Sequence, residues 1–341
     1  MKHCILFLHL ICALGTAAAQ SMTVFDLPVK TSIRGMAVVD TQTIWISGSN
    51  GYFGVTHDGG RSWNMQQVPD YDSAEFRDIE VFSDGSILLM SSTAPAAILR
   101  SADTGRTWSQ VFRSDNPAYF LDAMDFHGEH GMCLGDPVDG HFLTLYSHDA
   151  GRYWEKRFLS ERTDSLAAFA ASGSVVQFLT KKHIVFATGG AQARVYYTRD
   201  KGITWQYQQT DITQGAPSTG IFSLAVCDRK TLIAAGGDYL QPKGSGRNLD
   251  ILHYRDQRWG LSEGAEYDLT GTRTLGYISG IACGPNDILV ACGTSGAAII
   301  SDTYTLIADK AFNVVQFAPK SNTCFLAGNS IFGVYTLNVK R

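Results

Sequence analysis

Three aspartates are the residues of this 341-residue sequence that best suit acid–base chemistry. Asp78 and Asp122 stand at the beginning of apolar segments, and Asp136 follows another such segment in GDPVDGH, residues 135–141. Two carboxyl groups that face each other across a cleft can act as general acid and general base on a glycosidic bond. We therefore take Asp78, Asp122 and Asp136 as candidate catalytic residues. The alternative is that they cap strand ends, with Asp136 and Asp139 forming an ordinary turn.

A ring of polar residues is predicted around these carboxyl groups. Seven apolar segments each carry a polar or charged residue near their start, namely Arg34, Asp78, Asp122, Ser172, Ser223, Ser279 and Asn313. The set is extended by Arg77 and by four loop residues, Asp136, His141, Asp238 and Tyr239. Polar groups that converge on a concavity are typical of a ligand site. The alternative is that they satisfy one another and hold water in a polar channel.

Other kinds of chemistry find less support in the residues. His127 and His130 in FHGEHG have a spacing that suits a metal, but they fall in a predicted turn away from the polar ring. We expect them to be surface residues. We predict no metal and no cofactor, because the sequence carries no nucleotide motif and no nucleophile elbow. The formal net charge of −4 gives no basic excess that would favour nucleic acid or an anionic membrane as a partner.

The elements that would position these residues form a repeat. The pattern S/T-x-D-x-G-x-x-W occurs as THDGGRSW (56–63), SADTGRTW (101–108), SHDAGRYW (147–154) and TRDKGITW (198–205). Its recurrence every 45–51 residues is typical of a β-propeller. The Asp can accept hydrogen bonds from backbone N–H groups, while the Gly supplies an unusual turn dihedral. Because a catalytic residue is needed only once, we interpret the repeated residues as structural: Asp58, Trp63, Asp103, Trp108, Asp149, Trp154, Asp200 and Trp205.

Strand patterns divide the chain into seven units and predict no helix. The innermost strands are expected at 33–39, 77–82, 121–126, 169–176, 221–227, 277–283 and 312–317. The units cover approximately residues 31–67, 76–112, 119–158, 165–209, 220–262, 277–309 and 312–341. The last unit lacks a fourth strand, and we expect residues 22–29 to supply it and close the ring. The predicted fold class is all-β, a single seven-bladed β-propeller over residues 20–341.

The repeated pattern is the Asp-box, and with seven units the chain resembles the photosystem II stability/assembly-factor-like propellers and their secreted bacterial relatives. The resemblance covers nearly the whole chain after its first nineteen residues. It implies a seven-bladed fold and a role in the assembly of a membrane protein complex through binding. Sialidases also carry Asp-boxes, but they have six blades and an arginine triad with a Tyr and a Glu. Only Arg34 resembles one of those arginines, so the resemblance favours binding over catalysis.

Residues 1–19 are predicted to be a secretory signal peptide. The segment MKHCILFLHLICALGTAAA has a short charged start, an apolar run and a small-residue cleavage site after Ala19. A membrane anchor is the alternative, but the apolar run is too short to span a bilayer. Cys12 lacks the sequence context of a lipid anchor. We therefore expect a secreted or periplasmic protein.

Five cysteines follow the predicted cleavage site: Cys133, Cys227, Cys283, Cys292 and Cys324. They lie on predicted strands and do not have the paired spacing of metal ligands. We interpret them as small buried apolar residues. One disulfide is the alternative in an oxidising compartment.

Two classes of function remain after these considerations. The first, which we favour, is a monomeric, non-enzymatic binding or assembly module that presents its channel mouth to a protein complex or a glycan. It would use the longer loops at 68–75, 113–119, 210–219 and 239–249. The second is a glycoside hydrolase or lyase that uses the candidate aspartates. An enzyme requires two carboxyl groups in one pocket, whereas a binding module requires a broad exposed surface.

Overall fold

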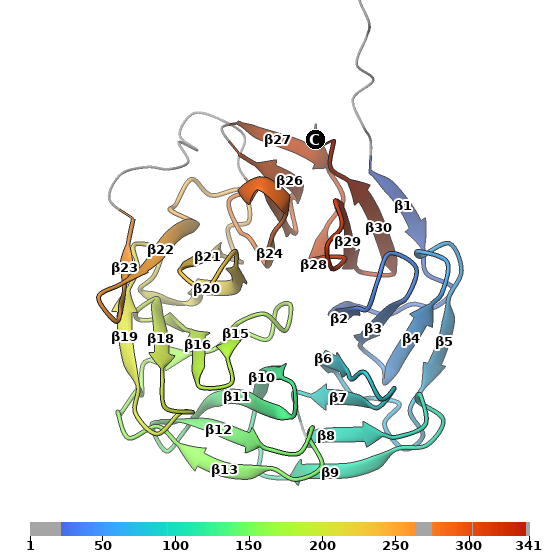
Figure 1. The fold of residues 1–341 in the computed structure, drawn as a ribbon, viewed down its shortest axis with the longest axis horizontal. Coiled ribbons are helices and arrows are strands. Elements are labelled where there is room, and N and C mark those ends of the chain that lie inside the picture. Colours follow the sequence, from blue (N-terminus) through green and yellow to red (C-terminus); the bar gives the residue numbers. More distant parts are fainter. Residues whose placement is uncertain (1–21, 94, 263–274, 302, 339–341) are drawn as a thin grey trace, which may run out of the picture.

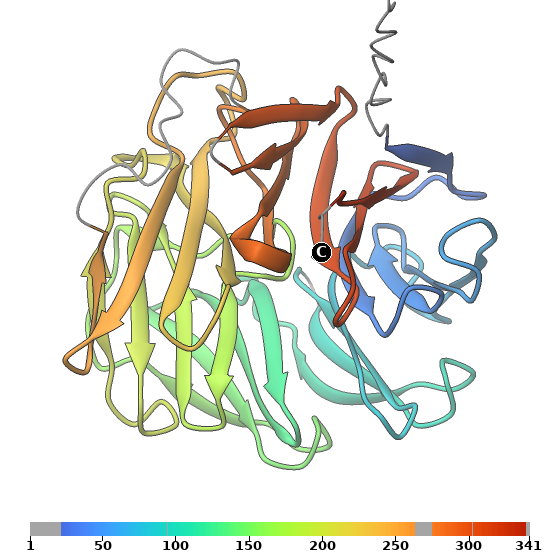
Figure 2. The ribbon, with the colours of Figure 1, turned by 45° about the horizontal axis from the view of Figure 1, so that its top comes forward.

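Seven antiparallel sheets stand around a central channel like the blades of a propeller (Figure 1). The computed structural model describes residues 22–93, 95–262, 275–301 and 303–338, so the predicted signal peptide lies outside the described residues. A tilted view shows the sheets side by side around the centre (Figure 2). The predicted seven-bladed, all-β fold is confirmed. The described part of the chain contains no helix long and apolar enough to cross a membrane.

Blades 1 to 4 follow one another along the chain, each as a sheet of four strands. Blade 1 contains β2 (Ile33–Val38), β3 (Ile44–Gly48), β4 (Tyr52–Thr56) and β5 (Asn64–Gln67). Blade 2 contains β6 (Phe76–Val81), β7 (Ile87–Ser91), β8 (Ala96–Ser101) and β9 (Ser109–Ser114). Blade 3 contains β10 (Leu121–His127), β11 (His130–Val138), β12 (His141–Ser147) and β13 (Glu155–Phe158). Blade 4 contains β15 (Val176–Thr180), β16 (His183–Ala187), β18 (Arg194–Thr198) and β19 (Gln206–Gln209).

Blades 5 to 7 complete the ring. Blade 5 contains β20 (Ala216–Val226), β21 (Thr231–Asp238), β22 (Leu249–Arg255) and β23 (Arg258–Leu261), extended by the short β14 (Leu166–Ala167) and β17 (Gly189–Gly190). Blade 6 contains β24 (Gly280–Cys283), η1 (Pro285–Asp287), β25 (Leu289–Gly293), β26 (Gly296–Ile300) and β27 (Tyr304–Ala308). Blade 7 contains β28 (Phe312–Phe317), β29 (Thr323–Gly328), β30 (Ile331–Thr336) and β1 (Thr23–Asp26).

The two ends of the described chain close the ring within blade 7. Strand β1 pairs antiparallel with β30, from Thr23 opposite Val334 to Asp26 opposite Ile331. Just beyond β1, the side chain of Leu27 is 7% exposed and packs in a core shared by blades 1 and 7. The prediction that the N-terminal segment supplies the missing outer strand is therefore confirmed. The ring cannot open without separating β1 from β30.

Each Asp-box turn ties its own residues together. In blade 1, Asp58 accepts hydrogen bonds from the Thr56 hydroxyl at 2.8 Å and from the backbone N–H of Ser62 at 2.9 Å. The aspartates of blades 2 to 4 make the corresponding bonds. Blade 5 replaces this turn by a two-residue hairpin in which Asp256 and Gln257 both have positive φ.

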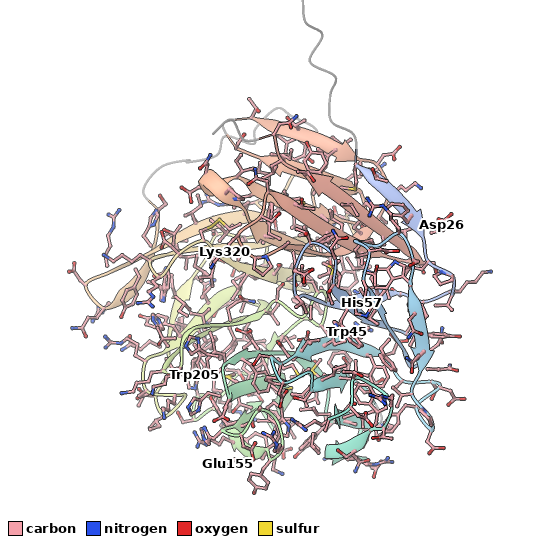
Figure 3. All side chains as sticks on the ribbon, turned by 45° about the vertical axis from the view of Figure 1, so that its right-hand side comes forward. Asp26, Trp45, His57, Glu155, Trp205 and Lys320 are labelled. Carbon is pink, nitrogen blue, oxygen red and sulfur yellow. A yellow bond between two sulfur atoms is a disulfide. The ribbon has the colours of Figure 1, made fainter. Side chains whose placement is uncertain are left out.

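The same turns also lock each blade to the one before it. The glycine of the second Asp-box, Gly105, has φ +87°, and a Cβ there would lie 2.7 Å from the ring of Phe53 in blade 1. The Trp108 ring meets the same Phe53 edge-on, with centroids 5.1 Å apart. Side chains such as Trp45 fill the space between neighbouring blades (Figure 3). Gly is required here because any side chain would enter the neighbouring blade.

The innermost strand of blade 4 differs from its prediction. The sequence predicts a strand at 169–176, but β15 covers Val176–Thr180 and residues 168–175 form no strand. Backbone carbonyls of this loop accept hydrogen bonds from arginine side chains of blades 1 and 2. The backbone polar groups thus find partners without a strand ladder.

The cysteines also need a correction. Cys227 and Cys283 form a disulfide with a Cα–Cα distance of 5.2 Å, so the interpretation of all five as buried apolar residues is wrong for these two. Cys227 directly follows β20 and Cys283 ends β24, and these innermost strands of blades 5 and 6 are neighbours in the ring. The other three, Cys133, Cys292 and Cys324, are buried and free.

Candidate functional site

Five innermost strands contain one extra residue at the same point. The antiparallel register slips there, for example between Ile33 and Gly35 in β2 and between Phe76 and Asp78 in β6. A bulge of this kind re-aims the extra side chain. The extra residues are Arg34, Arg77, Asp122, Phe222 and Asn313.

Because of the bulge, the predicted ring of polar residues was wrong at two positions. Arg77 and Phe222, rather than Asp78 and Ser223, occupy the positions equivalent to Arg34. Successive residues of a strand point to opposite sides, so a shift of one residue moves a side chain to a different surface. Asp78 is only 5% exposed and Ser223 is fully buried. The ring is therefore less polar than expected, because one of its positions is a phenylalanine.

A cavity of about 550 Å³, which we call the mouth cavity, lies at the end of the channel where the bulged residues gather. Its lining includes Arg34, Arg77, Phe120, Asp136, Tyr239 and Asn313. One wall is aromatic: Phe169 and Phe222 stack with ring centroids 3.9 Å apart, and Tyr277 meets Phe222 edge-on at 4.9 Å. The cavity therefore combines two cationic side chains with an apolar wall.

The loop of residues 168–175 projects into the channel (Figure 1), and its residues 168–171 line the mouth cavity. We call this loop the plug. Nη1 of Arg34 donates to the carbonyl oxygen of Ala171 at 3.3 Å, and Nη1 of Arg77 donates to that of Ala170 at 3.1 Å. A loop of blade 4 thus reaches blades 1 and 2 on the other side of the channel.

Further bonds hold the plug at its two ends. The carboxylate of Asp136 accepts a hydrogen bond from the backbone N–H of Ala168 at 2.9 Å. At the other end, the hydroxyl of Ser174 lies 2.7 Å from that of Ser172 and 2.6 Å from that of Ser223. Ser172 is therefore part of the plug and does not belong to a strand-borne ring.

A second cavity, of about 690 Å³, lies on the far side of the plug, and we call it the far cavity. Asp78, Glu80 and Asp125 line it. Asp78 accepts hydrogen bonds from the backbone N–H groups of Ile79 at 2.9 Å and Met124 at 2.7 Å. Burial raises the pKa of Asp78 and of Glu80 well above their usual values, and that of Asp125 to about 6. These carboxyl groups therefore retain protons at a higher pH than exposed ones do.

The three candidate catalytic carboxyl groups do not share one cavity. Asp78 lines the far cavity, whereas Asp136 lines the mouth cavity. Asp122 is fully buried, and neither of its carboxyl oxygens has a hydrogen-bond partner. Burial, and then repulsion by Asp136, raises the pKa of Asp122 well above its usual value, while burial raises the pKa of Asp136 to about 6. The geometry thus presents no pair of these carboxyl groups to a common ligand.

Several other predicted site residues bond to their own surroundings. Nδ1 of His141 donates to a carbonyl oxygen of the loop after β13 at 2.8 Å. Asp238 accepts a hydrogen bond at 3.0 Å from a backbone N–H two residues later, and Ser279 is buried and bonded to backbone carbonyls. Tyr239 differs from these, because it lines the mouth cavity and is 46% exposed.

The aromatic wall is the part of the site that the sequence reasoning missed. Phe120, Phe169, Phe222 and Tyr277 line the mouth cavity from four different blades or loops, and none of them is among the predicted site residues. Phe222 occupies the bulge position at which other blades carry Arg, Asp or Asn. A phenylalanine at a position that is polar elsewhere in the repeat was the available signal.

Comparison with known proteins finds sequence similarity to one group of propellers. The family model described as "Photosynthesis system II assembly factor YCF48" matches residues 15–116. The photosystem II assembly lipoprotein Ycf48 of Synechococcus sp. (strain CC9902) is 23% identical over 209 residues. That match covers 60% of this chain and 58% of the relative, so it spans less than two thirds of the relative's length.

Solved structures agree on the fold. "YCF48 bound to D1 peptide" is 16% identical with a TM-score of 0.62, covering 94% of this chain and 98% of that one. YCF48 from Cyanidioschyzon merolae is 12% identical with a TM-score of 0.64, covering 93% and 98%. The WD40 repeats of RRP9 reach the same TM-score at 13% identity, covering 94% and 99%, so this likeness is one of fold. The chain is therefore a seven-bladed β-propeller that is similar in sequence and in fold to photosystem II assembly factors.

Proposed function

We propose that this protein is a non-enzymatic binding module that binds a segment of a partner protein at the mouth cavity. This binding would assist the assembly of a protein complex. The observation that carries the proposal is that Arg34 lines the mouth cavity without an acidic partner among the described ion pairs. Its guanidinium donates to a backbone carbonyl of the plug and forms none of the ion pairs found among the described residues. Burial, and then the charge of Arg77, lowers the pKa of Arg34. Arg77 lies 3.9 Å from the carboxylate of Glu75, so an anionic group on a partner would supply the ion partner that Arg34 lacks.

The aromatic wall supplies the second half of the docking surface. Phe169, Phe222 and Tyr277 form a small cluster with Ala171, apart from the cores between the blades. On the rim, Leu240 is 70% exposed, next to the half-exposed Tyr239. Aromatic anchors beside an arginine are typical of the energetically dominant part of a protein interface. A segment that carries both a carboxylate and an apolar side chain fits this combination.

The relatives support a protein as the partner. One solved relative is described as bound to a D1 peptide, and the curated relative is described as an assembly lipoprotein. We transfer the class of partner, a protein segment, and not its identity. A ligand that needs no chemical conversion is also consistent with carboxyl groups that lie in separate cavities.

We further propose that the protein acts outside the cytoplasm, in the periplasm or after secretion. The disulfide between Cys227 and Cys283 supports this location, because such bonds persist in oxidising compartments. The predicted signal peptide, with cleavage after Ala19, would direct the chain there.

Site-specific photo-crosslinking in the native envelope tests the docking surface. A crosslinker at Leu240, on the rim of the mouth cavity, should capture a defined protein. The matched control is a crosslinker at Ile203, which is 76% exposed on the Asp-box turn of blade 4. This turn joins β18 to β19, at the end of the blade that faces away from the mouth cavity. A peptide from the captured region should bind the purified protein at least about tenfold more weakly after Arg34→Gln. Equal capture at both positions, or an affinity unchanged by Arg34→Gln, would contradict the proposal.

A further inference from the structure

Two histidines of blade 3 form a cluster outside both cavities. His130 begins β11, and His148 directly follows β12. The ladder between these strands pairs Gly131 with Ser147, so His130 and His148 are the next cross-strand neighbours and their side chains lie on one face. Their Nδ1 atoms are 3.1 Å apart.

The backbone holds this pair in place from both sides. The backbone N–H of Ala150, in the Asp-box turn, donates to the carbonyl oxygen of Glu129 in the β10–β11 hairpin at 2.9 Å. Within the turn, Asp149 accepts hydrogen bonds from the Ser147 hydroxyl at 2.9 Å and the backbone N–H of Tyr153 at 3.0 Å. The two imidazoles therefore project from a fixed scaffold, which lowers the cost of ordering them around a ligand.

We propose that His130 and His148 bind a divalent transition-metal cation of the zinc, nickel and copper class through their facing nitrogens. With metal–nitrogen bonds of about 2.0–2.1 Å, two ligands of a tetrahedral site lie about 3.3 Å apart. Two neighbouring ligands at right angles, as in a square or octahedral site, lie about 2.9 Å apart. The observed 3.1 Å falls between these separations. Imidazole ligands suit these cations, whereas calcium and magnesium prefer oxygen ligands.

The competing arrangement is a hydrogen bond in which one Nδ1–H donates to the other Nδ1. A metal takes the place of that shared proton without a net loss of protons, because each neutral imidazole then carries its single proton on Nε2 and one ring changes tautomer. Glu129 lies near enough to His130 to attract a cation, while Lys181 and Lys201 oppose one. Among the described residues, no group of three or more metal-ligating side chains forms, so these residues supply two ligands to the site. The remaining coordination positions are open to water or to a group on another molecule.

Blade 1 provides a matched control for this site. His57 occupies the same position in the first Asp-box turn as His148 does in the third. The ladder pairs Ile44 with Thr56, so the cross-strand neighbour of His57 is Thr43 and not a histidine. Figure 3 shows His57 well away from Glu155, which begins the outer strand of blade 3. A lone surface imidazole and a cross-strand pair can thus be compared within one protein.

The test is a calorimetric titration of the mature chain, which begins at Gln20 after the predicted cleavage, with Ni²⁺ and Cu²⁺, repeated with Ca²⁺. We expect saturable binding of one Ni²⁺ or Cu²⁺ per chain, no binding of Ca²⁺, and a Cu²⁺ paramagnetic resonance spectrum with nitrogen couplings. His130→Gln and His148→Gln should each weaken binding at least about tenfold, whereas His57→Gln should leave it unchanged. Thermal unfolding without metal verifies that each variant is folded. If one of the two histidine variants does not fold, the other one alone is sufficient to test the site. Absence of saturable binding, or equal loss in His57→Gln, would overturn the proposal.

Discussion

Replacing Asp136 by Asn isolates the free-energy cost of burying a carboxyl group beside the plug. Burial raises the pKa of Asp136 from 3.8 to about 6. Because the folded state then holds this proton more tightly than the unfolded state, ionisation favours unfolding. The stability that this group contributes is complete below pH 3.8 and is lost as the pH rises through 6. The difference between the two pKa values corresponds to about 3 kcal/mol, of which about 1 kcal/mol is lost between pH 5 and pH 8.

The assay is urea unfolding at pH 5 and at pH 8, followed by tryptophan fluorescence. Asn keeps an oxygen that can accept the hydrogen bond from the N–H of Ala168, so Asp136→Asn should fold. Between the two pH values, the wild type should lose about 1 kcal/mol more free energy of unfolding than Asp136→Asn does. Asp139→Asn is the control, because Asp139 is exposed in the turn directly after β11, three residues from Asp136, and it should behave like the wild type. Equal pH dependence in the wild type and in Asp136→Asn would refute the reasoning.

Three further predictions concern how the ring is held together. Removing residues 22–30 should lower the free energy of unfolding by about 3 kcal/mol or more, because β30 loses four backbone partners; an unchanged melting temperature would mean that the ring closes without β1. Gly105→Ala should lower the free energy of unfolding by about 1–3 kcal/mol through overpacking, in addition to the cost of its positive φ. Gly128→Ala has a positive φ but no atom within 4 Å, so it should lower the free energy of unfolding by only about 1 kcal/mol. Equal losses in urea unfolding would argue against the tight contact between blades. Reducing the bond between Cys227 and Cys283, which closes a separation of 56 residues, should cost about 3–4 kcal/mol. The double Ala variant should be insensitive to reductant, and a wild type equally insensitive would contradict the bond.

The repeat and its closure could be predicted because both are properties of short segments. In the Asp-box, Asp58 forms hydrogen bonds with groups no more than four residues away, so the conformation of each turn depends on residues of the motif itself. The closing strand followed from a last unit with three strands and an unassigned segment at 23–29, which left a single pairing open. The positive φ of the turn glycines follows from the same local pattern.

The candidate site could be predicted only in part. Arg34 and Arg77 were recognised as charged residues at the start of innermost strands, and the structure brings both to the mouth cavity. The bulge, however, adds one residue to the strand, and a strand period of two does not reveal which residue is extra. The expected ring therefore included Ser223, whereas the structure places its neighbour Phe222 at that position.

The propeller, its Asp-box turns and its closure follow from the amino-acid sequence, since they arise from local patterns repeated along the chain. The segment that occupies the channel depends instead on contacts between distant residues. Residues 169–175 have the alternation of a strand, yet they form the plug because arginines from blades 1 and 2 supply partners for their carbonyls. Likewise, Cys227 and Cys283 meet only because two blades are neighbours in space. Contacts between segments far apart in the chain depend on register and on the closed ring, and neither is encoded in any one segment.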